Sequence, residues 1–243
     1  NYFQTGDMAF LKWPGFTYVV QAGSATIAKR SEPNANTVFT GKGSRLCRIL
    51  LSHPDHSWKQ VELARRSGLT RGYVSQLVNR MLLENYLRVE NSRYFLNDRD
   101  ILLDAWAKVY RFHAFQVRQQ YAVAMKDYHD GLKKLAAGLK ELKIPFAFTG
   151  WSAAALRAPF TEPQSLMAYV GNLPEKLAGF FPVDQGGNVM LYVPNDTGRL
   201  QEGFESDGYP LVCDVQAYLD LKKMPGRADD QAEYLRDRFL RGR

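Results

Sequence analysis

Side chains that can pair with nucleic-acid bases and phosphates recur at helical spacing between residues 70 and 80. They carry hydroxyl, guanidinium or amide groups, and they comprise Thr70, Arg71, Tyr73, Ser75, Gln76, Asn79 and Arg80. An amide can form two hydrogen bonds with adenine, and a guanidinium can do the same with guanine or contact a phosphate. The pattern therefore predicts a surface that recognises double-stranded DNA.

Apolar residues of the same stretch predict how that surface is held. A stripe at spacings of three and four comprises Val74, Leu77, Val78 and Met81. This spacing predicts a helix with one buried face. Thr70 is placed to cap its start, and Gly68 is placed to end a preceding helix, because glycine adopts the left-handed conformation at little cost.

Two further helices are expected before this one. The first is marked by Leu46, Ile49, Leu50 and Leu51. It should end before Pro54, because proline is poorly tolerated inside a helix. Ser57 is expected to cap the second helix, in which Val61 and Ala64 should face inward, with Leu63 at the flank.

Alternating residues after Glu84 predict a β-hairpin over 86–96 that turns at Asn91 and Ser92. Three helices followed by a hairpin form the winged helix-turn-helix arrangement, in which the third helix enters the DNA major groove. Arg88 and Arg93 in the hairpin would then approach the DNA backbone. A winged helix that serves as a protein-interaction scaffold stays open as an alternative, since these charges could simply be solvated.

The net charge of +7 is concentrated in this region. Residues 41–97 hold ten lysines and arginines against four aspartates and glutamates. Positive charge gathered on one module favours a nucleic-acid partner more strongly than a high isoelectric point does.

The rest of the chain predicts an α+β protein. Apolar residues from Leu102 to Leu142 recur at three or four positions, which predicts a helical connector over 98–142 with a bend at Gly131. Its apolar stripe is compatible with a homodimer or with packing on its own chain, and His113 is expected as a packed imidazole. Residues 1–40 form an N-terminal segment with a small hairpin in "FTYVVQ" and "ATIAKR".

Residues 143–243 alternate short strands and helices, which predicts a C-terminal α/β domain. The strand candidates are "IPFAFTG", "SLMAYVG" and "NVMLYVP". The helix candidates are "WSAAALRA", "PEKLAGFF", "DVQAYLDLKK" and "DDQAEYLRDRFL".

Catalytic and metal-binding alternatives are weaker. Ser152 follows a strand as a hydrolase nucleophile would, but all four histidines precede it, so we expect a helix cap. His53 and His56 lack a third ligand nearby and are expected as solvated histidines. We expect no metal and no cofactor. No apolar run approaches the roughly 18 residues that would span a bilayer, so a cytoplasmic protein without membrane contact is expected.

Four segments resemble AbiEi-family antitoxins of type IV toxin-antitoxin systems. They are "LLDAW", "FAFTGWSAAALRAPF", "GGNVMLYVP" and "DVQAYLDLKKMPGRADDQAEYLRDRF". The resemblance spans residues 42–240. It implies a winged helix that represses its own operon, and a C-terminal domain that opposes a nucleotidyltransferase-like toxin without forming a stable complex with it.

The strand, turn and small-residue helix around Gly150 also resemble a nucleotidyltransferase, which is the alternative function. Nucleotidyl transfer needs clustered carboxylates that hold a divalent metal. The acids after Gly150 are Glu162 and Glu175, thirteen positions apart, and Asp214 and Asp220 lie six apart in a predicted helix. We therefore expect a domain of this fold without its catalytic acids, and no enzyme.

Overall fold

The computed structural model describes residues 38–112 and 116–241, together with the backbone of several short strands before residue 27. The chain divides into two compact units, Asn1–Thr37 and Val38–Arg243. In the first unit, strands β1 (Tyr2–Thr5), β2 (Met8–Trp13), β3 (Phe16–Gln21) and β4 (Ser24–Thr26) form an antiparallel sheet in chain order. The predicted hairpin is present in part as β3 and β4, within a larger sheet, and residues 27–30 of its second strand lie outside the described residues.

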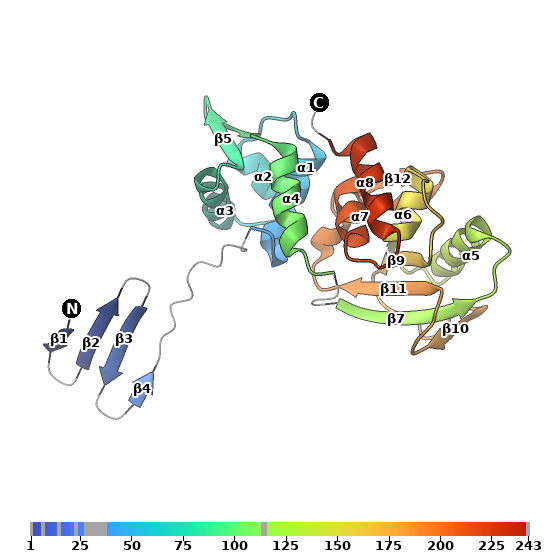
Figure 1. Cartoon of the computed structure of the whole chain (residues 1–243), viewed down its shortest axis with the longest axis horizontal. Coiled ribbons are helices and arrows are strands. Elements are labelled where there is room, and N and C mark those ends of the chain that lie inside the picture. The colour runs from blue at the N-terminus through green and yellow to red at the C-terminus, as the bar shows by residue number, and fades with distance from the viewer. Residues whose placement is uncertain are drawn as a thin grey trace. The chain divides into compact units, whose positions relative to one another are not determined.

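The second unit begins with three helices and a hairpin (Figure 1). They are α1 (Ser44–Ser52), α2 (Gln60–Ser67), α3 (Arg71–Leu83), β5 (Leu87–Glu90) and β6 (Arg93–Leu96), preceded by a 3-10 turn η1 (Gly41–Gly43). We call residues 44–96 the helix-hairpin module. Its core is formed by the buried faces of the three helices.

Local sequence signals explain the boundaries of this module. Gly68 ends α2 with a φ of 67°, and its amide donates to the Ala64 carbonyl. The Thr70 hydroxyl accepts a hydrogen bond from the Tyr73 amide at 3.4 Å, which caps α3. The hairpin turns at Asn91 and Ser92, both with positive φ, as a two-residue turn of this kind requires. These three predictions are confirmed.

The start and the phase of α2 were predicted wrongly. Lys59 is its N-cap, and Ser57 does not cap it. The Trp58 backbone instead pairs with Tyr94 through two hydrogen bonds of 2.8 Å, which extends the chain before α2. Successive helical residues lie about 100° apart, so residues 61 and 63 face nearly opposite sides. The larger Leu63 is fully buried, and Val61 is 48% exposed.

The predicted helical connector over 98–142 is also wrong, because a strand interrupts it. Helix α4 (Arg99–Val109) is followed by strand β7 (Gln116–Val123) and helix α5 (Tyr128–Glu141). Tyr121 and Val123, two positions apart, are both buried, which is the period of a strand. β7 gains backbone partners on both sides, β10 (Phe180–Val183) and β11 (Val189–Pro194). His113 lies outside the described residues.

β7 belongs to a mixed sheet with the strand order β10-β7-β11-β9-β8-β13-β12. Its other strands are β8 (Phe146–Phe148), β9 (Leu166–Val170), β10 (Phe180–Val183), β11 (Val189–Pro194), β12 (Phe204–Ser206) and β13 (Tyr209–Leu211). Helices α6 (Gly150–Arg157), α7 (Asp214–Leu221) and α8 (Ala228–Phe239) lie above β7 and β11 in Figure 1, and η2 (Thr197–Leu200) is a 3-10 turn. We call residues 116–241 the sheet module.

The three predicted strands of this module are confirmed, as are three of its four predicted helices. The segment "PEKLAGFF" is not helical: Gly179 has a φ of 79°, outside the range of a helix interior, and Phe180 begins β10. Ser152 is not a cap, because α6 begins at Gly150 with Thr149 as its N-cap. The buried Ser152 hydroxyl accepts a hydrogen bond from the Met167 amide at 2.7 Å. Among the described residues, no helix is both long and apolar enough to cross a membrane.

Candidate nucleic-acid interface

Helix α3 separates an apolar face from a polar one. Val74, Val78 and Met81 are fully buried, and Leu77 is 3% exposed. On the other side Arg71, Gln76 and Asn79 are exposed. Thr70 is also exposed, and Tyr73, Ser75 and Arg80 are partly so. The helix therefore presents guanidinium and amide groups on one solvent-facing side.

Arg80 differs from the other members of this surface. Its guanidinium forms an ion pair with Glu84, one helical turn along. An ion pair of this kind neutralises part of the charge that a phosphate would otherwise meet. Arg71, the other arginine of α3, forms no ion pair among the described residues.

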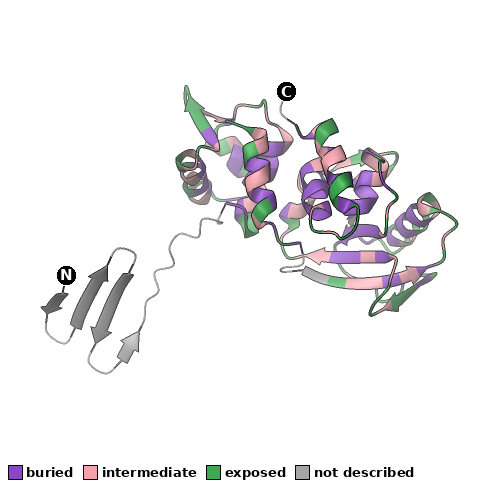
Figure 2. Cartoon of the chain, in the orientation of Figure 1, coloured by how far each residue is buried: buried purple, intermediate pink, exposed green. Residues whose placement is uncertain are grey.

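The hairpin arginines are tied into the module. Arg88 donates to the Leu96 carbonyl at 3.0 Å and to Glu90 at 2.9 Å, and it lies over the Phe95 ring. Arg93 donates to the Ser57 hydroxyl at 2.7 Å and to the Ser57 carbonyl at 2.8 Å. β5 is exposed along most of its length (Figure 2). Both arginines thus support an exposed hairpin, in addition to any contact with a partner.

Two exposed positive side chains of the helix-hairpin module were missed by the sequence analysis. Lys59 and Arg65 are exposed, and neither forms an ion pair within the part of the chain that the structure describes. Arg65 follows the buried Leu63 and Ala64, so the corrected phase of α2 would have predicted its exposure. With Arg71 they supply positive charge on the module that no ion pair offsets among the described residues.

Other arginines of the module attach it to the sheet module. Arg45 on α1 donates to Asp196 at 2.9 Å, and Arg66 on α2 donates to Glu202 at 2.7 Å. His53 also hydrogen bonds to Glu202 at 2.7 Å, so it is not merely solvated as expected. Burial alone would raise the pKa of both carboxyl groups. The hydrogen bond from Arg45 outweighs this effect and lowers the pKa of Asp196. Hydrogen bonds from Arg66 and His53 lower the pKa of Glu202 in the same way.

A buried polar network continues this attachment inside the protein. Arg48 of α1, 1% exposed, donates to the side-chain amide oxygen of Gln216 at 2.7 Å and lies over the Trp106 ring. Gln216 donates to Asp220 at 2.8 Å. Tyr110 at the end of α4 and Thr149 before α6 also donate to Asp220. Burial raises the pKa of this carboxyl. The two modules are thus joined by their side chains as well as by the chain.

Residues 95–241 match the family model of the AbiEi antitoxin, a transcriptional regulator of type IV toxin-antitoxin systems. The chain belongs to this family. The match covers more than half of the chain and includes α4 and the sheet module, where the four resembling segments lie. No curated protein and no solved structure gave a match. The family resemblance inferred from the sequence is therefore confirmed, and α1, α2 and α3 lie outside the matched residues.

The AbiEi family consists of antitoxins and transcriptional regulators, which implies a regulator rather than an enzyme. The acidic residues considered for catalysis do not gather in one site of the described structure. Asp214 pairs with Arg157 at 3.1 Å, Asp220 is enclosed in the buried network, and Glu162 and Glu175 are exposed. Within the described residues, no group of three or more histidines, cysteines, aspartates and glutamates could hold a metal ion.

Proposed function

We propose that this AbiEi-family regulator binds double-stranded DNA through the helix-hairpin module, acting as a winged helix-turn-helix. α3 would lie in the major groove, and the β5-β6 hairpin would follow the backbone. The observation that carries this proposal is the exposure of Arg71, Gln76 and Asn79 opposite a buried stripe on α3. These are side-chain types that recognise guanine and adenine in the major groove.

The positions of the positive side chains support the same orientation of the module on DNA. Lys59 stands before α2, Arg65 is near its end, and Arg71 begins α3. All three are exposed, and none forms an ion pair with an acid among the described residues. These positive side chains would bind the phosphates of the DNA, while the side-chain amides of α3 would select its sequence. Arg80, Arg88 and Arg93 contribute by keeping the helix and hairpin in place as well as by their charge.

We further propose that the regulator represses its own operon and opposes a nucleotidyltransferase-like toxin without a stable complex. Family membership supports a toxin as the functional partner. The sheet module contributes binding and positioning rather than nucleotidyl transfer, because its acids are dispersed or already paired. A scaffold that only contacts proteins would not require the base-pairing side chains of α3 to be solvent-facing.

Footprinting on the DNA upstream of the protein's own gene tests the DNA-binding role. We expect one protected operator, and repression of a reporter placed behind it. The variant Gln76→Ala should need more protein to give the footprint, and Gln164→Ala, which removes an exposed glutamine of the sheet module, should give it as the wild type does. Absence of any protected site in wild-type protein would contradict the proposal and favour the scaffold.

A second experiment tests the antitoxin role. The open reading frame next to the gene is expressed alone and together with the regulator, and cell growth is measured. We expect growth inhibition by the neighbour and rescue by the regulator, with no complex recovered by size-exclusion chromatography. A harmless neighbour, or a co-eluting pair, would contradict this part of the proposal.

A further inference from the structure

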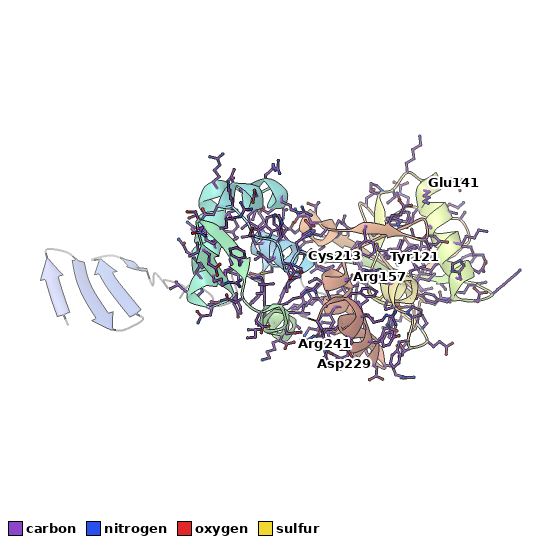
Figure 3. The ribbon with its side chains drawn as sticks, turned by 90° about the horizontal axis from the view of Figure 1, so that it is seen from above. Tyr121, Glu141, Arg157, Cys213, Asp229 and Arg241 are labelled. Carbon is purple, nitrogen blue, oxygen red and sulfur yellow. The ribbon has the colours of Figure 1, made fainter. Side chains whose placement is uncertain are left out.

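A cavity of about 340 Å³ lies where the helix-hairpin module meets the sheet module. The end of α1 and the start of α4 line one side, through Ser52 and Arg99. β12, α7 and the end of α8 line the other. Figure 3 labels two lining residues of the sheet module, Arg157 and Cys213. The volume is at the lower end of the range for small-molecule sites.

Most charged groups on the wall are already neutralised. Asp214 receives two hydrogen bonds from Arg157, at 3.1 and 3.3 Å. Arg157 also lies over the Phe239 ring at 3.7 Å. Glu202 is held by Arg66 and His53. Glu205 is exposed.

Among the positive side chains of this wall, Arg99 is the one that forms no ion pair with a described residue. Its Nε is buried and has no hydrogen-bond partner, and no ion pair of Arg99 occurs within the described residues. Partial burial lowers the pKa of its guanidinium. A desolvated positive charge is costly unless a negative group meets it, because water no longer stabilises it.

Other groups at the same wall can add to the binding of a negative group. Ser52 lies near the Cys213 thiol, but its buried Oγ makes no hydrogen bond of ordinary geometry in the described structure. Arg99 and Asp214 are the first residues of α4 and α7, so two helix N-termini reach the cavity. Helix N-termini favour anions. Phe204 and Phe239 add aromatic surface.

We propose that this cavity binds a small organic acid, a carboxylate or phosphate ester, whose anionic group is held by Arg99. The guanidinium fork would receive the anionic oxygens, with the Ser52 hydroxyl as a further donor. The remainder of the ligand would lie against Phe204 and Phe239. A ligand bound in this cavity would contact α1 and α4 on one side and α7 and α8 on the other. This contact does not involve the residues proposed to bind DNA.

Benzoate and phenyl phosphate serve as probes, because they share a ring and differ in the anionic group. Amide chemical shifts of the full chain are followed during titration, together with calorimetry. We expect saturable binding of at least one probe with a Kd of about 1 mM or tighter. The shifts should be centred on Ser52, Arg99, Ser206 and Val215, and the probe that binds identifies the acid class.

Arg99→Ala should weaken binding by about ten-fold or more, because a charge-assisted hydrogen bond is lost. Arg118→Ala, which removes an exposed arginine of β7 outside the cavity, should bind as the wild type does. Arg99→Ala should unfold at the same temperature as the wild type or higher, because the desolvation of Arg99 outweighs its attraction to Asp100, Asp214 and Asp55. Retained binding in Arg99→Ala, or no saturable binding of either probe, would overturn the proposal.

Discussion

Arg93 in the hairpin donates hydrogen bonds to both the hydroxyl and the carbonyl of Ser57, at 2.7 and 2.8 Å. Ser57 immediately precedes the Trp58 backbone that pairs with Tyr94. The base of the hairpin is therefore fastened to the segment that leads into α2. The position of the hairpin relative to α3 depends on this contact.

Replacement of Arg93 by alanine should affect both stability and DNA binding. We expect a loss of roughly 1 to 2 kcal/mol of unfolding free energy, because two hydrogen bonds of a charged donor are removed. DNA affinity should fall by a similar factor for every sequence. Urea denaturation and titration with two unrelated duplexes measure these effects. Ser57→Ala, which removes one acceptor, should lose less stability, and a change of sequence preference in Arg93→Ala would show that the hairpin reads bases.

Lys59 and Arg65 should contact phosphates. Each neutralised phosphate contributes about −0.9 to the slope of log K against log salt concentration. Lys59→Ala and Arg65→Ala should each reduce the steepness of that slope by nearly this amount. Lys140→Ala, which removes an exposed lysine of α5, should leave the slope unchanged. Equal slopes in all four proteins would remove Lys59 and Arg65 from the interface.

The ion pairs of Asp196 and Glu202 predict acid sensitivity of the junction between the modules. Both pKa values are lowered in the folded protein. A lowered folded pKa adds stability above the unfolded pKa, and this stability is lost as pH falls through the folded value. We expect unfolding free energy to decline below about pH 4 to 5. Glu202→Gln should be less stable at pH 7 and should lose less on acidification, and a pH dependence identical to wild type would contradict this role.

Asp220 should be structural. Asp220→Ala removes the acceptor of the Tyr110 and Thr149 hydroxyls and one of the two acceptors of the Gln216 amide, which should cost about 3 kcal/mol or more. Asp220→Asn retains an acceptor oxygen and should cost less. Because the folded pKa is raised, the stabilisation by Asp220 is full below the unfolded pKa and declines as pH rises. The deficit of Asp220→Asn should therefore shrink from pH 4 to pH 8 in chemical denaturation, and a constant deficit would contradict the raised pKa.

Features set by neighbouring residues could be predicted from the sequence. The Thr70 cap, the Gly68 stop and the buried stripe of α3 depend on positions within one or two turns. The hairpin turn at Asn91 and Ser92 is equally local. These signals place Arg71, Gln76 and Asn79 on the solvent-facing side without information from the rest of the chain.

Features set by distant residues could not be predicted. β7 has apolar spacing that also fits a helix, and its strand conformation depends on pairing with β10 and β11, which lie far along the chain. Arg48 looks like an exposed helical arginine, but Gln216, 168 positions later, accepts its hydrogen bonds inside the protein. Arg80 likewise forms an ion pair with Glu84, and Arg93 donates a hydrogen bond to Ser57. A position on the solvent-facing side of an element therefore does not by itself leave the charge of an arginine without a partner.

The direct test of the central claim is sequence readout by α3. Fluorescence anisotropy compares a matched operator with a scrambled duplex of equal length, at one fixed salt concentration. Wild type should prefer the operator by a factor of about 10³ or more. Gln76→Ala and Asn79→Ala should each lose roughly 1 to 3 kcal/mol of discrimination and bind the scrambled duplex almost as before, with Gln164→Ala as the unaffected control. Equal losses on both duplexes, or no preference in wild type, would contradict the claim that α3 reads DNA.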